Sequence, residues 1–482
     1  MVKTIGNVQK DAQVRAVASG ALSNGDTVIV NSDGTVSAVS GAAEGSGTAT
    51  TFESANVLYT SATFDSNSNK VVIAYRDSGN SNYGTAVVGT VSGTSISFGS
   101  PTIFNSDGQT DYIDTAFDSA NNKVVIAYRN LGNSNYGTAI VGTISGTSIS
   151  FGSASVFNSG TTTYPSLTFD TNSSKIVVAY QDNSNSFYGT AAVGTVSGTS
   201  ISFGTEVVFN SGITHYTSAV FDSSNNKVVI GYTDSSNSNY GTAVVGTVSG
   251  TSISFGSEVV FEDSRVDFVD STFDSFSEKV IFAYKNEPNS NAGTAVVGTV
   301  SGTSVSFGTP VVFQASTSDY VQCVYDSNAN KINIFFRDNT SAPYPLRQTV
   351  GTVSGTSVSF TTSSILENVN ASYIGATFDS NANKVVVTYR DESNSYYGKA
   401  IVFQNESTNL TSDNFIGFAD GAYADTQSAA INSTCSVDDN QTGLTAGQKY
   451  YVQSDGTLST TAGDPTVEAG TAISPTKILV KG

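Results

Sequence analysis

Seven aromatic residues recur along this chain at intervals of 52 or 53 residues, and their type suggests stacking against a ligand. On the inner strands of a ring of repeats they would encircle one mouth of a central channel, where aromatic faces can stack on sugars. The simpler alternative is that they pack neighbouring repeats together, with each Tyr hydroxyl at the wet edge. The seven residues are Tyr59, Tyr112, Tyr164, Tyr216, Phe268, Tyr320 and Tyr373.

An aspartate follows each aromatic by six positions, and a lysine lies five positions further on, as in Asp65 and Lys70. One interpretation is a sevenfold acidic or metal site, since Asp65, Asn67 and Asn69 resemble the start of a calcium loop. The glycine and distal glutamate that such loops need are missing. Turn chemistry favours an Asx-type hairpin turn with a cross-strand ion pair.

Catalytic constellations find little support in the sequence. The single histidine, His215, cannot serve several copies of a Ser-His-Asp set, and we expect it to be a solvated side chain in a surface loop. A carboxylate pair for sugar hydrolysis stays open. We predict no catalytic residues, no metal site and no cofactor.

The aromatics belong to a repeat that returns seven times. Its clearest copy starts at Phe64 and reads FDSNSNKVVIAYRDSGNSNYGTAVVGTVSGTSISFGSPTIFNS. β-Branched and aromatic runs separated by Gly, Ser and Asn predict four antiparallel strands, at 59–65, 70–77, 84–91 and 94–105 with a bend at Gly99. Four strands in about 52 residues predict one blade of a β-propeller, so we expect an all-β, seven-bladed propeller.

The seventh copy stops after its third strand, and its missing fourth strand stands at the front of the chain, within 47–56. We therefore predict that the N-terminal strand closes the ring, which leaves no free blade edge. The expected domains are an N-terminal β module at 1–46, the propeller at 47–405 and a C-terminal β module at 406–482. The flanking modules are related, because Leu22, Gly25 and 32–34 match 444, 447 and 454–456 at one offset, and we expect them to pack together.

Variation between the copies gathers in the connection from the fourth strand to the next first strand. This connection carries His215 beside Tyr216, and Arg265 and Asp267 beside Phe268. Binding residues commonly sit on loops held by a rigid scaffold. The face of the ring that carries these connections is therefore a candidate partner surface. Neutral drift of unconstrained loops is the alternative.

Composition excludes several classes of partner. A formal net charge of −19 argues against nucleic acid and anionic membranes. The two cysteines are far apart and provide no disulfide framework, and no apolar run is long enough to span a membrane. The first 17 residues lack a signal-peptide core, so we expect synthesis in a cytoplasm.

The terminal segments NFIGFADGAYADTQSA, GLTAGQKYYVQSDGTLST and GTAISPTKILVKG resemble small β modules of tail-fibre and other virion-surface proteins of bacteriophages, particularly marine ones. The repeats, with NKVVIAYRD and YGTAVVGTVSGTSISFG, are similar to repeats in such phage proteins. The resemblance implies a non-enzymatic fibre, tail-tip or capsid-surface component, located on the virion and made in the host cytoplasm. It supplies no catalytic residues.

Three functions follow in order of preference. The first is adhesion of the propeller disc to host-cell glycans, with the terminal modules docked to other virion proteins. The second is a purely structural decoration protein without a ligand, and the third is a glycan depolymerase. Homo-oligomerisation through the terminal modules stays open.

Overall fold

The computed structural model describes residues 12–463 and 465–481, which form two compact units built of β-strands. The repeat unit covers Ser46–Phe403, and the terminal unit joins the described residues up to Gly45 to those from Gln404 onward. The described helices are two short 3₁₀ turns, η1 (Leu131–Asn133) and η2 (Ser235–Asn237), and none could cross a membrane. The all-β prediction is confirmed. Residues 1–11, which bear on the signal-peptide prediction, lie outside the described residues.

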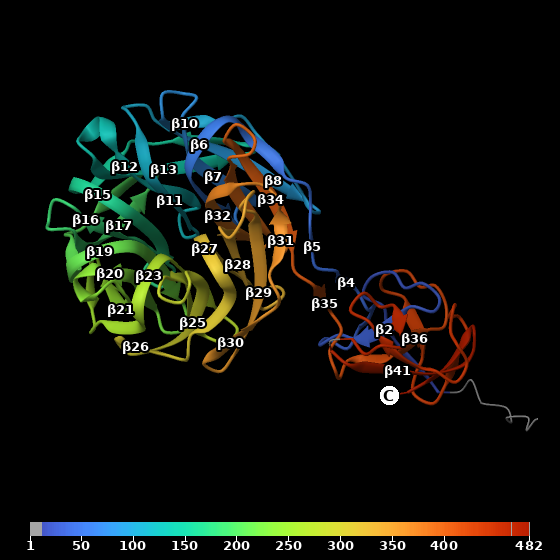
Figure 1. Ribbon diagram of the computed structural model, residues 1–482. Coiled ribbons are helices and arrows are strands. Elements are labelled where there is room, and N and C mark those ends of the chain that lie inside the picture. The colour runs from blue at the N-terminus through green and yellow to red at the C-terminus, as the bar shows by residue number, and fades with distance from the viewer. Residues whose placement is uncertain (1–11, 464, 482) are drawn as a thin grey trace, which may run out of the picture. The chain divides into compact units, whose positions relative to one another are not determined.

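Each repeat contributes two long antiparallel strands, and Figure 1 shows these pairs arranged around a common centre. The first strands of the pairs are β7 (Lys70–Asp77), β12 (Lys123–Asn130), β16 (Lys175–Asp182), β20 (Lys227–Asp234), β24 (Lys279–Asn286), β28 (Lys331–Asp338) and β33 (Lys384–Asp391). Their partners are β8 (Tyr83–Ser92), β13 (Tyr136–Ser145), β17 (Tyr188–Ser197), β21 (Tyr240–Ser249), β25 (Ala292–Ser301), β29 (Leu346–Ser354) and β34 (Tyr397–Gln404).

The predicted bend at Gly99 separates a short hairpin strand from the strand that follows. The short strands are β9 (Ser95–Phe98), β14 (Ser148–Phe151), β18 (Ser200–Phe203), β22 (Ser252–Phe255), β26 (Ser304–Phe307) and β30 (Ser357–Phe360).

The variable connections that we predicted as loops are mostly strand. Five strands of 16 residues run without a break from the outer edge of one repeat into the next: β6 (Thr50–Asp65), β15 (Ser155–Asp170), β19 (Val207–Asp222), β23 (Val259–Asp274) and β27 (Val311–Asp326). The first half of β19 pairs with β17, and its second half pairs with β20. Because each half has its own hydrogen-bonding partner, the variable residues stay extended.

In the other two repeats the equivalent of this 16-residue strand is divided into two shorter strands. Turn-forming residues separate β10 (Thr102–Asn105) from β11 (Thr110–Asp118), and β31 (Ser364–Glu367) from β32 (Ala371–Asp379). The repeats therefore fall into a 21-stranded and a 9-stranded sheet. Within the smaller sheet β6 pairs with β34, Tyr397 lying opposite Asn56. As predicted, the N-terminal strand pairs with the third strand of the seventh repeat.

The core lies between successive repeats. On β16, Ile176, Val178 and Tyr180 pack against β12 and β13 of the preceding repeat. The alternate residues Val177 and Ala179 pack against β19 to β21 of the following repeat. Both faces of the strand are buried, which explains its continuous apolar run.

The recurring aspartate forms the predicted Asx turn. In the fourth repeat Asp222 is fully buried and accepts the backbone N–H groups of Ser224 and Asn225, each at 3.0 Å, and the Asn225 side-chain amide at 2.9 Å. The prediction of a cross-strand ion pair is wrong in this repeat. Lys227 lies opposite Asp222 in register, but its ammonium donates to the hydroxyl of Thr247 at 3.0 Å.

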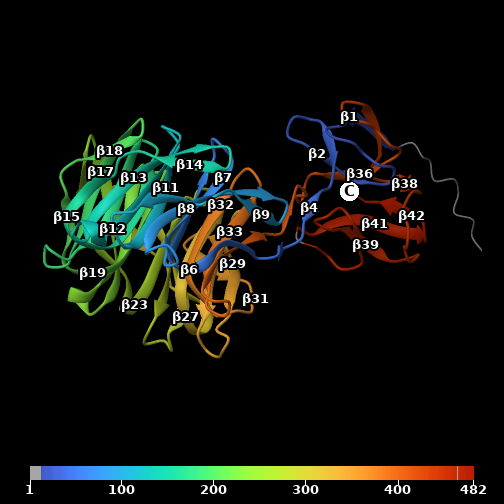
Figure 2. The ribbon, with the colours of Figure 1, turned by 90° about the horizontal axis from the view of Figure 1, so that it is seen from above.

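The terminal unit contains two five-stranded sheets with the same strand order. Figure 2 shows β1, β2 and β36 on one side of this unit and β39, β41 and β42 on the other. The first sheet runs β1 (Gln13–Val17), β37 (Ser428–Asn432), β36 (Phe415–Ala419), β2 (Thr27–Val30), β3 (Val36–Ala38). The second runs β38 (Val437–Asp438), β42 (Lys477–Val480), β41 (Val467–Ser474), β39 (Lys449–Val452), β40 (Leu458–Ser459). Two-residue strands β4 (Gly41–Ala42) and β35 (Ser407–Thr408) pair beside them, and β5 (Gly45–Ser46) follows.

The two sheets match in detail. A bulge glycine with positive φ, Gly417 at 143° and Gly470 at 149°, occupies the same strand of each sheet. Asp33 and Asp455 accept the N–H and hydroxyl of the threonine two residues later in equivalent turns. The chain thus holds one β module twice, and the repeat unit is inserted in the first copy between β3 and β36. Ile29 and Phe418 of the first copy share a core with residues of the second.

We predict that Asp222→Ala lowers the free energy of unfolding by about 1–3 kcal/mol, because the turn loses the buried carboxylate that accepts three of its hydrogen bonds. Urea denaturation followed by circular dichroism measures the change. Ser223→Ala, an exposed position in the same turn, is the matched control and should leave the midpoint unchanged. Equal loss of stability in both variants would contradict the role assigned to the carboxylate.

Candidate functional site

The seven recurring aromatics meet in a continuous cycle. Neighbouring ring centroids lie 5.0–5.5 Å apart all the way round, and the contact of Tyr373 with Tyr59 joins the seventh repeat to the first. These seven half-buried rings, which we call the mouth, line a cavity of about 290 Å³. The rings pack against each other and also face this cavity.

Each mouth residue adopts a left-handed backbone conformation, with φ between 48° and 52°. Bulky side chains rarely do so. The strand register shifts at every one of these positions, for example between Thr163 and Ser166 around Tyr164. A β-bulge therefore turns each aromatic out of the strand, as bulges beside functional sites do. Seven copies of the same costly conformation indicate that the position of the rings matters.

Five of the seven rings carry a cation on their face. The contacts are Arg76 over Tyr59 at 5.1 Å, Arg129 over Tyr112 at 4.7 Å, Lys285 over Phe268 at 5.0 Å, Arg337 over Tyr320 at 4.8 Å and Arg390 over Tyr373 at 4.8 Å. We call these five cations, with Asp111, Asp267 and Asp319 between them, the charged collar. Such contacts contribute roughly 0.5–2 kcal/mol each, depending on how well they are desolvated.

Two carboxylates of the collar, Asp111 and Asp319, link neighbouring repeats. Asp111 pairs with Arg76 of the preceding repeat and with Arg129 of its own at 2.6 Å. Asp319 pairs in the same way with Lys285 at 3.2 Å and Arg337 at 3.1 Å. All these groups are largely buried, so the collar fixes the positions of the rings below it.

The collar is interrupted in the third and fourth repeats, where Gln181 and Thr233 occupy the cation's position. Gln181 lies opposite Thr163 in register, as Arg129 lies opposite Asp111. No cation–π contact to Tyr164 or Tyr216 occurs in the described part of the chain. These two neighbouring rings are thus chemically different from the other five.

The remaining predicted residues, His215, Arg265 and Asp267, lie next to this interruption. His215 is not solvated as expected: it is half-buried, edge-on to Tyr164 at 5.8 Å, with Nδ1 3.2 Å from the Gln181 amide. Burial lowers the pKa of its imidazole, against the opposing influence of the Asp267 carboxylate. Arg265 is 52% exposed and pairs with Glu287 at 2.8 Å, while Asp267 is buried.

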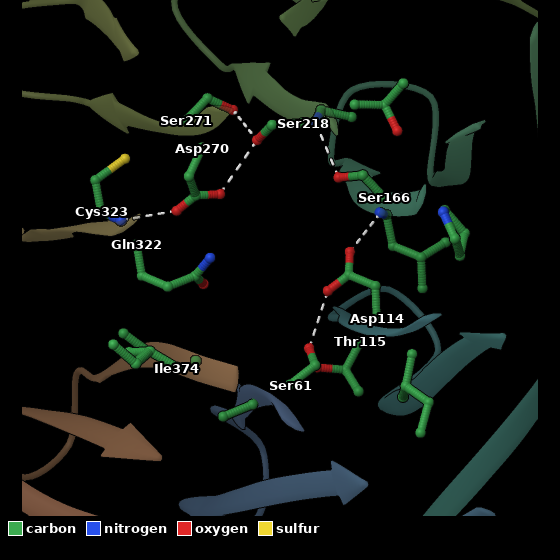
Figure 3. A pocket seen from close by; sticks show the side chains of 18 of the residues that line it. Ser61, Asp114, Thr115, Ser166, Ser218, Asp270, Ser271, Gln322, Cys323 and Ile374 are labelled. Carbon is green, nitrogen blue, oxygen red and sulfur yellow. Dashed lines mark hydrogen bonds between the residues drawn. The ribbon is translucent and has the colours of Figure 1, made fainter. Parts of the chain in front are cut away.

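Beyond the mouth, a polar channel of about 320 Å³ continues among the inner strands. The residues that follow the aromatics, such as Thr60 and Thr217, line both cavities. Figure 3 shows two carboxylates, Asp114 and Asp270, projecting into the channel from different repeats.

Each channel carboxylate joins three repeats. Asp114 accepts the Ser61 hydroxyl of the preceding repeat at 2.9 Å and the Leu167 N–H of the following repeat at 2.7 Å. Asp270 accepts the Ser218 hydroxyl at 3.2 Å and the Cys323 N–H at 2.7 Å. Burial raises the pKa of both carboxyl groups to about 6, and for Asp270 the charge of Asp114 adds to the effect. The described residues include no group of three or more acidic, His or Cys side chains that could hold a metal ion.

Sequence reasoning missed the collar cations and the channel carboxylates. The signal for the collar was the residue directly after the aromatic that ends the second strand's apolar run, such as Arg76 after Tyr75. This residue is a cation in five repeats and neutral in two, while its neighbours stay similar. The signal for the channel was the residue two positions after each aromatic, which is Asp in the second and fifth repeats only.

Comparison with known proteins gives likeness in fold without likeness in sequence. No family model matches the chain, and no curated protein matches it. The BP39L lectin from Burkholderia pseudomallei is similar in structure, with a TM-score of 0.55 and 10% identity, covering 74% of this chain and 99% of that one. AofleA from Arthrobotrys oligospora reaches a TM-score of 0.41 with 7% identity, covering 71% of this chain and 94% of its own. The likeness to BP39L concerns the fold alone.

We predict that replacing both channel carboxylates, Asp114→Asn with Asp270→Asn, flattens the pH dependence of stability between about pH 4 and pH 6. A folded-state pKa above the unfolded value of about 4 means that ionisation destabilises the fold as pH rises to 6. This penalty is at most about 2–3 kcal/mol per group, and the variant lacks it. Urea unfolding at pH 4 and pH 7 measures the difference from the parent chain, and identical pH profiles would contradict the assignment.

Proposed function

We propose that the repeat unit is a closed seven-bladed β-propeller that binds glycans at its mouth. The observation that carries the proposal is the unbroken cycle of seven aromatic rings around a cavity, each ring held in place by a strained bulge. The pairing of β6 with β34 supports the closed ring.

Carbohydrate binding fits the chemistry of the mouth. The rings of Tyr164 and Tyr216, which carry no cation on their faces in the described part of the chain, supply flat apolar surface for the C–H faces of sugars. The likeness of the fold to a lectin supports the same class of ligand. The proposed activity is binding without catalysis.

We further propose that the chain is a surface component of a bacteriophage virion, with the terminal unit docked to the particle and the repeat unit presented for host attachment. The support is the resemblance of the terminal segments and repeats to phage virion-surface proteins. Weak single-site binding suits this role, because many copies on one particle multiply its strength.

We predict that the full chain binds bacterial surface polysaccharides on a printed array, and that the double variant Tyr164→Asn with Tyr216→Asn reduces binding about tenfold or more. Asparagine tolerates the left-handed backbone at these positions, so the variant removes the rings without adding strain. Phe276→Ala removes a 75% exposed aromatic in the Asx turn of the fifth repeat and should bind as the parent does. If the chain binds no glycan but attaches to phage particles from which this protein has been removed, it is a decoration protein. If it releases reducing sugar from the polysaccharides, it is a depolymerase.

A further inference from the structure

In the first and fifth repeats the collar places one cation between an aromatic face and a carboxylate of the next repeat. In the first repeat Arg76 lies over Tyr59 and pairs with Asp111. In the fifth repeat Lys285 lies over Phe268 at 5.0 Å and pairs with Asp319 at 3.2 Å. The second case shows that a primary ammonium fits this geometry.

In the fourth repeat the aromatic is Tyr216 and the next repeat again supplies a carboxylate, Asp267, but a short neutral residue occupies the cation's position. Thr233 is 2% exposed, and its hydroxyl donates to the backbone carbonyl of Val266 at 3.0 Å, so it faces the strand rather than the ring. The third repeat differs. Next to its ring, Tyr164, the following repeat supplies His215 at the position where the second repeat supplies Asp111. Only the fourth repeat therefore combines an uncapped ring with a neighbouring carboxylate.

The carboxylate of Asp267 is also less neutralised than those of the other repeats. Its cations lie at 3.5 Å, for Lys285, and 4.0 Å, for Arg265. Both are shared, Lys285 with Asp319 and Arg265 with Glu287. A hydrogen bond with Asp267 raises the pKa of Glu287, which indicates crowding of negative charge. His215 faces the same region, and its lowered pKa keeps it from supplying a cation at neutral pH.

We propose that this position binds the protonated primary amine of an amino sugar, with the ammonium over Tyr216 and beside Asp267. The inference rests on the proposed glycan binding and narrows it to glycans that carry unsubstituted amino groups. An N-acetylated sugar of the same ring shape can stack on the mouth but offers no charge to either group. The neighbouring Tyr164, which also lacks a cation, supplies a face for the adjoining sugar.

The test uses the full chain and two matched oligosaccharides, a β-1,4-linked glucosamine oligomer and its fully N-acetylated form of equal length. Isothermal titration calorimetry should give about tenfold tighter binding of the amine form. Thr233→Arg installs the guanidinium that the first repeat carries, and it should bring both ligands to equal affinity. Asp267→Asn should do the same. Ser223→Arg adds the same charge at an exposed site of the same repeat and should leave the preference intact.

The outcomes separate the inference from the proposed function. If the parent chain binds both oligomers equally and the Tyr164 and Tyr216 double variant binds them more weakly, the amine site is overturned. The proposed glycan binding then still holds. A preference that survives Thr233→Arg overturns it as well. Failure of both oligomers to bind overturns the inference, and the polysaccharide array then decides the proposed function alone. Competition by glucosamine but not by methylammonium chloride shows that the sugar and its amine are recognised together.

Discussion

Hydrogen bonds from one long strand to two successive repeats hold the repeat unit together. Strand β19 completes the sheet of the third repeat with its first half and begins that of the fourth with its second. The same sharing forces close packing at the hairpins, where a Cβ atom on Gly99 would lie 1.9 Å from the Thr147 carbonyl oxygen of the next repeat. Each repeat is therefore incomplete without its neighbours, and the buried side chains between repeats follow from this arrangement.

The shared strand also creates the site. Side chains on a strand alternate between its two faces, so a regular strand would direct the recurring aromatic into the packing between repeats. The bulge at Tyr164 and its equivalents turns the ring toward the centre, at the cost of a left-handed backbone. The collar cations then hold the rings from one side. Where Gln181 and Thr233 replace a cation, the faces of Tyr164 and Tyr216 carry no cation in the described part of the chain.

Much of this could be predicted from the sequence, because it depends on local chemistry. The period, the Asx turn at Asp222, the bend at Gly99 and the strand exchange of β6 all follow from residues close together in the chain or from the repeat itself. The collar could not, because Arg76 and Asp111 meet across two repeats and only the register of both strands brings them together. The extended path of the variable residues was missed for the same reason, since their turn-like composition is overridden by partners on both sides.

The strand exchange has a second consequence, which concerns the terminal unit. Because β6 pairs with β34, the repeat unit begins and ends at neighbouring points, and the Gly47 N–H donates to the Val402 carbonyl at 2.9 Å. A domain with adjacent ends can be inserted into a loop of another domain without straining it. The first β module accepts the repeat unit between β3 and β36. In the second copy the equivalent strands, β40 and β41, are joined by a short connection. The pairing that completes the seventh repeat is thus also what permits one β module to carry the whole repeat unit in a single connection.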